Sequence, residues 1–394
     1  MSGVADKMRT FAENSSWIRK MFEEGARMKA EFGADNVFDF SIGNPDVPPP
    51  EQFHTTLLEL VRDRQPGVHG YMPNVGFPAV REALAKQLSL EQNASLTADD
   101  IVMTCGAAGG LNIVFKALLN PGDEVIVPAP YFVEYGFYVD NHGGVLKPVP
   151  TDKDFDLDLD AIEQALTAKT KIVLVNSPNN PTGQIYSAAS LKALGQLLDR
   201  ASAQYKTTMY LVSDEPYRNI VFDGHQVPPL MNTTTNAIIA SSYSKVLSLP
   251  GERIGYLALH PEMEDKAGVV GALALANRIL GFVNAPALMQ RTVMHLQGLS
   301  TDNSIYVRRM ETFCKVLDEA GLRYVRPKGA FYLFPQAPVD DVEFCRLLAK
   351  ERILAVPGQG FGLPGYIRLA FCVDEKVIAG SAAGFKKAVA AARS

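Results

Sequence analysis

The sequence predicts an α/β fold in two parts: a large domain with a mostly parallel sheet flanked by helices, and a smaller α+β domain. Through the middle of the chain, short apolar strands alternate with helical stretches, which is typical of a parallel sheet covered by helices on both faces. After about residue 285 this alternation ends, and longer helical sequence with separated strands follows. We therefore expect residues 46–285 to form the large domain, and residues 1–45 together with 286–394 to form the small one.

The expected elements follow in order along the chain. The first 35 residues have helical character, and three consecutive prolines at residues 48–50 end it, since proline cannot continue a helix. In the large domain we expect strands at residues 101–104, 124–127, 171–175, 209–213 and 237–242. In the small domain we expect a long helix around residues 286–319, a strand at 329–334, a helix near 342–352, a strand at 366–372 and a terminal helix. The large-domain strands end in polar or glycine- and proline-rich sequence, where ligands of open α/β sheets bind.

Composition favours small-molecule partners. The 394 residues are 47% hydrophobic and 21% charged, with a formal net charge of -5 and scattered basic residues, so neither nucleic acid nor an anionic membrane is expected. The four cysteines show no C-x-x-C spacing, which indicates reduced core residues and no metal site. The N-terminus has no signal-peptide core, and no apolar run approaches membrane-spanning length, so we expect a cytoplasmic protein.

The run Ser-Tyr-Ser-Lys at residues 242–245 places a lysine directly after an expected strand. A lysine in a confined, partly desolvated site near other cations loses its proton more easily and becomes a nucleophilic amine, which is the chemistry of a Schiff base. Ser242 and Arg253 flank Lys245 at spacings that could place a hydroxyl and a guanidinium on one phosphate. Because most lysines are solvated surface charges, this interpretation depends on the flanking residues.

Asp214 follows the expected strand at residues 209–213, where a buried carboxylate is costly unless a cation pairs with it. The protonated nitrogen of a pyridine ring is such a cation, and the pair would keep that ring a good electron sink. Tyr217 and Asn180 could hydrogen-bond the phenolic oxygen of the same ring. Alone, the sequence Asn-Pro-Thr-Gly at residues 180–183 is more typical of a plain turn.

Small residues follow the first expected large-domain strand at Gly106, Ala107 and Ala108, just before a helical stretch. They would let backbone amides and a helix N-terminus approach a phosphate, although glycines there also serve tight packing. Arg368 is a lone cation in an apolar strand and could clamp a substrate α-carboxylate, or could face water from an edge strand. With Lys245 and Asp214, these features indicate a pyridoxal-phosphate enzyme.

The same residues resemble the class I and II aminotransferases of fold type I, the aspartate aminotransferase superfamily. The resemblance runs nearly end to end and combines the lysine motif with Asn180 and Asp214 in a specific order. It includes residues 41–46, 71–76, 106–110, 130–132, 176–183, 213–217, 242–255 and 327–332 together with Arg368. The resemblance therefore implies the fold-type-I architecture, pyridoxal 5′-phosphate as cofactor and a role in amino acid metabolism.

By this resemblance, an L-amino acid gives its amino group to the cofactor, and a 2-oxo acid then takes it in a ping-pong scheme. Lys245 would form the internal aldimine and then carry the proton as general base and acid. Asp214 would pair with the ring nitrogen, while Tyr217 and Asn180 would hold the phenolic oxygen. Phe132 would stack on the ring.

The resemblance also assigns the remaining binding residues. Those at the phosphate would be Gly106, Ala107, Ala108, Ser242 and Arg253. The substrate α-carboxylate would contact Arg368 and Asn180, with Gly43 close by. Members of the superfamily are usually homodimers, and Tyr71 matches a tyrosine that reaches the phosphate of the neighbouring subunit.

Two positions depart from close relatives. Some relatives that use acidic substrates have a lysine at the position of Ala108, and several have tryptophan or tyrosine at that of Phe132. Two other functions are also compatible with parts of the pattern. A carbon-sulfur lyase shares Lys245, Asp214 and Asn180 and would release pyruvate and ammonia without a 2-oxo acid acceptor. A non-catalytic ligand-sensing module is the other, although no basic helix-turn-helix segment is seen.

Overall fold

A seven-stranded sheet forms the centre of the large part of the protein. The structure is a computed structural model that describes residues 3–13 and 17–394. The strand order is β2-β8-β7-β6-β5-β3-β4, and every neighbouring pair is parallel except those that β8 makes with β7 and β2. The strands are β2 (Ile101–Thr104), β3 (Glu124–Ala129), β4 (Val145–Pro150), β5 (Thr170–Asn176), β6 (Tyr210–Asp214), β7 (Ala237–Ser242) and β8 (Gly255–Leu259). The predicted α/β class with a mostly parallel sheet is confirmed.

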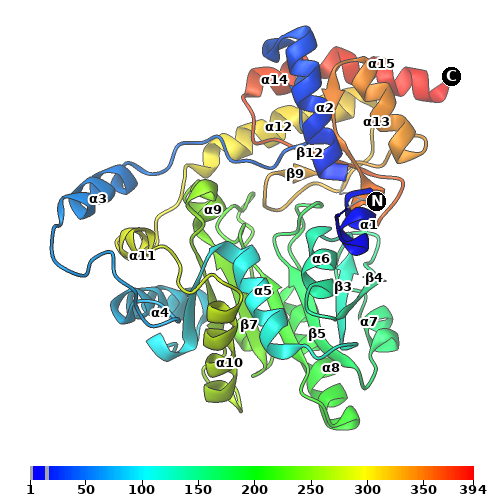
Figure 1. Ribbon diagram of the computed structural model, residues 1–394. Coiled ribbons are helices and arrows are strands. Elements are labelled where there is room, and N and C mark those ends of the chain that lie inside the picture. The colour runs from blue at the N-terminus through cyan, green and yellow to red at the C-terminus, as the bar shows by residue number, and fades with distance from the viewer. Residues whose placement is uncertain (1–2, 14–16) are drawn as a thin grey trace.

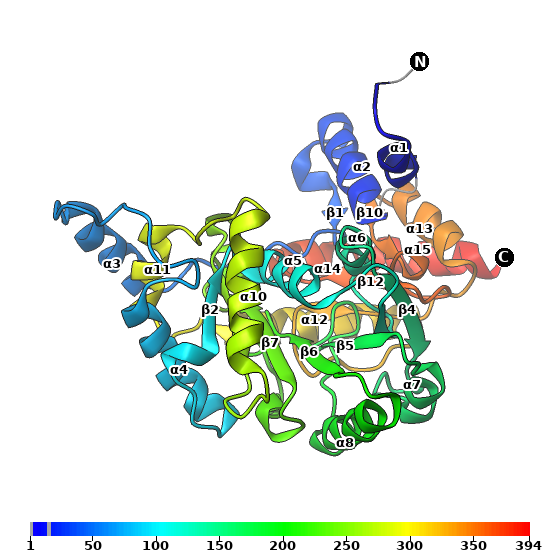
Figure 2. The same ribbon diagram turned by 60° about the horizontal axis from the view of Figure 1, so that its bottom comes forward.

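Helices cover both faces of this sheet, as Figures 1 and 2 show. Successive strand side chains point to opposite faces, so neighbours such as Ile172 and Val173 belong to two different hydrophobic clusters. One face packs against α5 (Gly106–Leu118), α6 (Glu134–Asp140) and α10 (Lys266–Ile279). The other packs against α4 (Pro78–Gln92), α7 (Leu159–Ala165) and α8 (Ala188–Tyr205). Near-continuous apolar strands are what a sheet buried on both faces requires.

A second group of elements lies above the carboxyl ends of the large sheet in Figure 1. Its strands are β1 (Phe38–Asp39), β9 (Tyr332–Leu333), β10 (Ile353–Leu354), β11 (Val356–Pro357) and β12 (Ile367–Ala370). They form a parallel pair, β1-β10, and an antiparallel sheet in the order β11-β12-β9. The helices around them are α2 (Trp17–Phe32), α12 (Asn303–Ala320), α13 (Asp341–Lys350), α14 (Glu375–Gly380) and α15 (Ala382–Arg393). Residues from both chain ends therefore meet here, because β1 pairs with β10. Helix α1 (Asp6–Glu13) lies against α6, where the Phe11 and Phe137 rings are 4.9 Å apart.

The prediction of a single long helix around residues 286–319 is wrong. The chain forms α11 (Ala287–Met294), then a loop, and then α12. Gly298 in that loop has a φ of 80°, a left-handed conformation that helices do not use. Asp302 then starts α12 by accepting a hydrogen bond from the backbone N–H of Ser304, as an N-cap aspartate does.

Helix α3 (Glu51–Arg62) stands apart from the rest of the protein at the end of an extended segment and touches α11 (Figure 1). The remaining helix, α9 (Tyr243–Val246), is a single turn directly after β7. No helix within the described residues is both long and apolar enough to cross a membrane.

Candidate active site

A cavity of about 390 Å³ lies at the carboxyl ends of the central strands, beneath β9 and β12. It brings together nearly all residues that the sequence predicts for the site. Those that line it are Gly43, Ala107, Ala108, Phe132, Asn180, Asp214, Tyr217, Ser242, Lys245, Arg253 and Arg368. The volume lies in the range of ordinary small-molecule sites.

Lys245 lies on the single-turn helix α9, which follows β7 without a loop and so presents the side chain at the strand end. Its Nζ donates a hydrogen bond to the carbonyl oxygen of Gly43 at 2.8 Å and lies 5.5 Å from the centre of the Phe331 ring. Burial, helped by the nearby cations Arg368 and Arg253, lowers the pKa of Lys245 to about 8. An appreciable fraction of the amine is therefore neutral near neutral pH and can act as a nucleophile.

Asp214 ends β6 and is buried, with 7% of its surface exposed. Its Oδ2 accepts a hydrogen bond from the Tyr135 hydroxyl at 2.6 Å, but its Oδ1 has no hydrogen-bond partner among the described residues. Desolvation raises the pKa of Asp214 to about 7, and the Tyr135 hydrogen bond opposes that rise only in part. A buried carboxylate that lines a cavity and has one unpartnered oxygen is suited to pair with a cationic nitrogen of a ligand.

Tyr217 and Asn180 face the same cavity from different loops. The Tyr217 hydroxyl shares a hydrogen bond of 2.8 Å with the Tyr332 hydroxyl. The backbone N–H of Asn180 donates to Asn176 Oδ1 at 2.7 Å, which fixes the turn after β5. This turn is therefore part of the site.

The end of the cavity near β2 is shaped for an anion. Gly106 opens the 13-residue helix α5 with a φ of 75°, and a Cβ there would stand 2.8 Å from Arg253 Nη2. Only glycine leaves room for this guanidinium beside the helix N-terminus. The Arg253 charge, the Ser242 hydroxyl and the positive end of α5 together suit a phosphate.

Arg368 points inward from β12 and is 2% exposed, so it is not an arginine that faces water from an edge strand. Its guanidinium lies 4.9 Å from the centres of both the Tyr332 and the Phe361 rings. Nη1 donates to Asn180 Oδ1 at 3.3 Å, whereas Nε has no partner among the described residues. Burial lowers the pKa of Arg368. The group can offer a carboxylate a fixed pair of donors.

Two predicted residues do not line the cavity. Gly106 lies just behind it, against Arg253. Tyr71 lies at the surface with 92% of its area exposed, so its predicted role depends on a second subunit. The structure also adds Tyr135 and Tyr332. Tyr332 belongs to the matching segment 327–332 but has no predicted role, and the hydrogen-bond partners of the two tyrosines are 79 and 115 residues away in the sequence.

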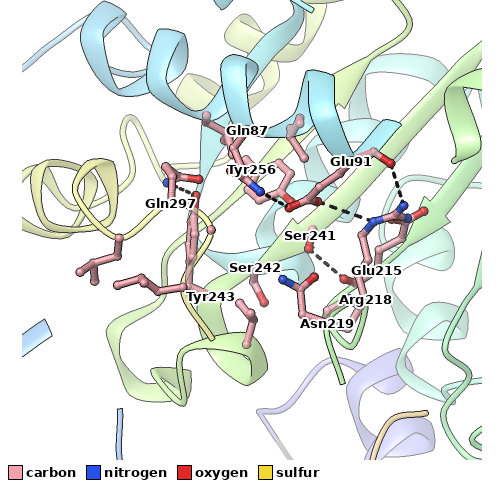
Figure 3. A pocket seen from close by; sticks show the side chains of 17 residues that line it. Gln87, Glu91, Glu215, Arg218, Asn219, Ser241, Ser242, Tyr243, Tyr256 and Gln297 are labelled. Atoms are coloured by element: carbon pink, nitrogen blue, oxygen red, sulfur yellow. Dashed lines mark hydrogen bonds and ion pairs between the residues drawn. The ribbon is translucent and has the colours of Figure 1, made fainter. Parts of the chain in front are cut away.

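The buried ion pair between Glu215 and Arg218 anchors the segment of residues 214–217. Figure 3 shows Glu215 and Arg218 in a second cavity of about 40 Å³. Arg218 Nη1 lies 2.8 Å from Glu215 Oε2, and its Nη2 donates to the carbonyl oxygens of Val227 and Glu91 at 3.1 and 3.3 Å. Arg218 therefore ties the segment after β6 to the end of α4.

Comparison with known proteins gives one consistent result. The sequence profile of the family described as aminotransferase class I and II matches residues 35–382. The aspartate aminotransferase of Thermotoga maritima is 33% identical over 367 residues, which are 91% of this chain and 93% of that protein. A crystal structure of an amino transferase from Eubacterium rectale has a TM-score of 0.96 and 39% identity and covers both chains completely. Aspartate aminotransferase from Thermus thermophilus with maleate has a TM-score of 0.86 and 27% identity, covering 98% of this chain and 100% of that one.

Proposed function

This chain belongs to the class I and II aminotransferases, and from that premise we propose how its residues share the reaction. It is a pyridoxal-phosphate-dependent transaminase that moves an amino group from an amino acid to a 2-oxo acid. The single observation that carries the residue assignment is the buried Oδ1 of Asp214, which has no partner among the described residues, on a side chain that lines the same cavity as Lys245.

We propose that Asp214 holds the ring nitrogen of the cofactor, while Tyr217 and Asn180 hold its phenolic oxygen. Phe132 would lie on the ring face. Ala107, Ala108, Ser242 and Arg253 would hold the phosphate, with Gly106 leaving the room that Arg253 needs. When bound, pyridoxal 5′-phosphate supplies an electron-withdrawing ring that stabilises negative charge at the substrate α-carbon.

Lys245 both anchors the cofactor and moves the proton at the substrate α-carbon. A lowered pKa suits this work, because a group that takes and returns a proton is most effective when its pKa lies near the working pH. Arg368 would orient the substrate through its α-carboxylate, with Asn180 beside it and the Gly43 backbone closing that side of the cavity. Held in this way, the α-hydrogen can face Lys245.

We also propose that the amino donor has an uncharged side chain. The cations among the described residues that line the cavity are Lys245, Arg253 and Arg368, and each already has a role in the scheme above. A side-chain carboxylate, as in aspartate, would enter without a cation of its own from this chain, and an unpaired charge in a confined site is costly. The relatives named for aspartate therefore do not settle the donor here.

Single-turnover kinetics test both proposals, with the spectrum of the bound cofactor as the signal. We expect alanine, methionine or phenylalanine to react at least about tenfold faster than aspartate at equal concentration, the equivalent of about 1.4 kcal/mol. The variant Ala108→Lys, which adds a cation to the cavity, should narrow that gap. Aspartate as the fastest donor would overturn the specificity. Pyruvate and ammonia formed without a 2-oxo acid would indicate a lyase instead.

A homodimer is the proposed assembly, with the cytoplasm as its location. Helix α3 extends away from the rest of the protein (Figure 1) and carries the exposed side chains of Leu58 and Val61, each 59% exposed. A second copy would cover these apolar groups and bring Tyr71 to a neighbouring site. Co-expression of chains with Tyr71→Phe and chains with Lys245→Ala tests this, because a shared site gives hybrid dimers an activity that differs from the sum of the two variants.

The division into a large part at residues 46–285 and a small part at 1–45 and 286–394 also stays a proposal. Separate hydrophobic clusters support two units, one around the large sheet and one around β9 and β12. Helix α11, which begins just after residue 285, packs against α3 and α4. Limited proteolysis would locate the junction.

A further inference from the structure

Tyr332 touches both the substrate end and the cofactor end of the proposed site, yet it has no part in the scheme above. It lies on β9, paired with Ala370 of β12, and only 2% of its surface is exposed. Its hydroxyl forms the 2.8 Å hydrogen bond with Tyr217, and its ring faces the Arg368 guanidinium. The hydroxyl also lies against the α-carbon of Gly43, where a Cβ would overlap it.

The ring and the hydroxyl of Tyr332 have separate roles. The Tyr332 ring packs on the Arg368 guanidinium, and the Phe361 ring packs on the same guanidinium at the same distance of 4.9 Å. Aromatic faces attract a guanidinium and limit its rotation, which matters for a group that must offer a carboxylate two parallel donors. Phe361 provides this packing without a hydroxyl, so the hydroxyl of Tyr332 is not needed for it.

Either hydroxyl of this 2.8 Å pair can donate, and we assign the donor role to Tyr332. Burial raises the pKa of Tyr332 to about 12, and the positive charge of Arg368 beside its ring counters that rise. Burial raises the pKa of Tyr217 as well, where the contact with Tyr332 adds to the rise and the charge of Arg368 again counters it. With Tyr332 as the donor, Tyr217 is the acceptor of this bond. The proton of Tyr217 is then left to point into the cavity.

We propose that Tyr332 is a positioning residue that links the carboxylate-binding Arg368 to the phenol of Tyr217. Its ring keeps the guanidinium oriented, and its hydroxyl directs the Tyr217 proton toward the phenolic oxygen of the cofactor. This rests on the proposed function. It adds to that function a physical connection between the two ends of the site, carried by one side chain.

The test uses the cofactor-loaded enzyme and the pH titration of the visible absorbance of its cofactor. Hydrogen bonding to the phenolic oxygen stabilises its negative charge, so a weaker bond raises the pH at which the neighbouring nitrogen loses its proton. Tyr332→Phe removes the hydrogen bond between Tyr332 and Tyr217 and so weakens the bond from Tyr217 to the phenolic oxygen. We expect the midpoint in this variant to move upward by about 0.2 to 0.7 pH unit. The KM for the amino donor should stay within about twofold, because the ring remains.

Phe361→Leu is the matched control, since it removes the other ring from Arg368 and leaves Tyr217 untouched. We expect it to raise KM several-fold and to leave the titration midpoint in place. In a Tyr217→Phe background, Tyr332→Phe should add no further shift, because the connection passes through Tyr217.

An unchanged titration midpoint in Tyr332→Phe would overturn the inference. It would also be overturned if Tyr332→Phe shifted the midpoint as much in the Tyr217→Phe background as in the unchanged protein. If the unchanged protein gives no titrating cofactor band, the proposed function fails, and this inference fails with it.

Discussion

Replacing Asp214 with asparagine should change cofactor binding and the stability of the cofactor-free protein in opposite directions. Asparagine has the same shape and can still accept the hydrogen bond that Tyr135 donates at 2.6 Å. It lacks the negative charge that the cofactor's ring nitrogen is proposed to need. It also removes a buried charge whose Oδ1 has no partner among the described residues.

The stability effect follows from the pKa of Asp214, which desolvation raises from 3.8 to about 7. The folded protein then binds more protons at this site than the unfolded chain does, so the free energy of unfolding falls as pH rises from about 4 to about 7. A shift of roughly three units corresponds to about 4 kcal/mol. Asp214→Asn removes this fall in the free energy of unfolding, because asparagine carries no charge. At pH 8 its cofactor-free form should melt about 3–5 °C above the parent, with little difference at pH 4.

Cofactor binding should change the other way. Removing one partner from a buried ion pair costs about 3–5 kcal/mol, which is a fall in affinity of about 10² to 10⁴-fold. Titration of the cofactor-free protein with pyridoxal 5′-phosphate, followed by absorbance, measures this directly. Glu215→Gln is the matched control. The Glu215 carboxylate pairs with Arg218 (Figure 3) and does not line the Lys245 cavity, so this variant should lose stability and keep most of its cofactor affinity. An Asp214→Asn protein that binds the cofactor as tightly as the parent would refute the ring-nitrogen assignment.

Three further predictions concern the surroundings of the site. Arg218→Met leaves the Glu215 charge buried without its partner and should lower the free energy of unfolding by about 3–5 kcal/mol; a melting temperature equal to that of the parent would contradict this. Gly106→Ala should displace the Arg253 guanidinium and weaken binding of pyridoxal 5′-phosphate at least about tenfold while leaving pyridoxal, which has no phosphate, unaffected; equal losses for both ligands would exclude the phosphate role. The rate at which Lys245 captures the cofactor should rise with pH and level off above about 8, where the amine is neutral, and a flat profile from pH 6 to 9 would argue against this lysine as the titrating nucleophile.

Much of the large sheet could be predicted because its strands are buried on both faces and read as apolar runs. All five expected strands are present, with bounds within two residues. The two that escaped prediction have weaker signals. The edge strand β4 carries two prolines and a lysine in six residues, and β8 has the sequence Gly-Tyr-Leu-Ala-Leu, which fits a helix as well as a strand.

The cavity residues were predictable for a related reason. Parallel strands end at one edge of the sheet, so the polar motifs after β5, β6 and β7 meet there whatever their separation in sequence. The roles of Tyr135 and Tyr332 have no such signal, although Tyr332 lies in the matching segment 327–332. Their contacts depend on how α6 packs on the large sheet and how β9 aligns with β12, and one sequence does not contain that information.

Lys245 as the residue that holds the cofactor is the central claim, and one measurement tests it most directly. Sodium borohydride should fix pyridoxal 5′-phosphate permanently to the lysine that binds it, and peptide mass spectrometry then locates the modified residue. We predict a single modified peptide with the cofactor on Lys245, and none in Lys245→Ala. Stoichiometric modification of a different lysine, or an equal yield in Lys245→Ala, would contradict the account.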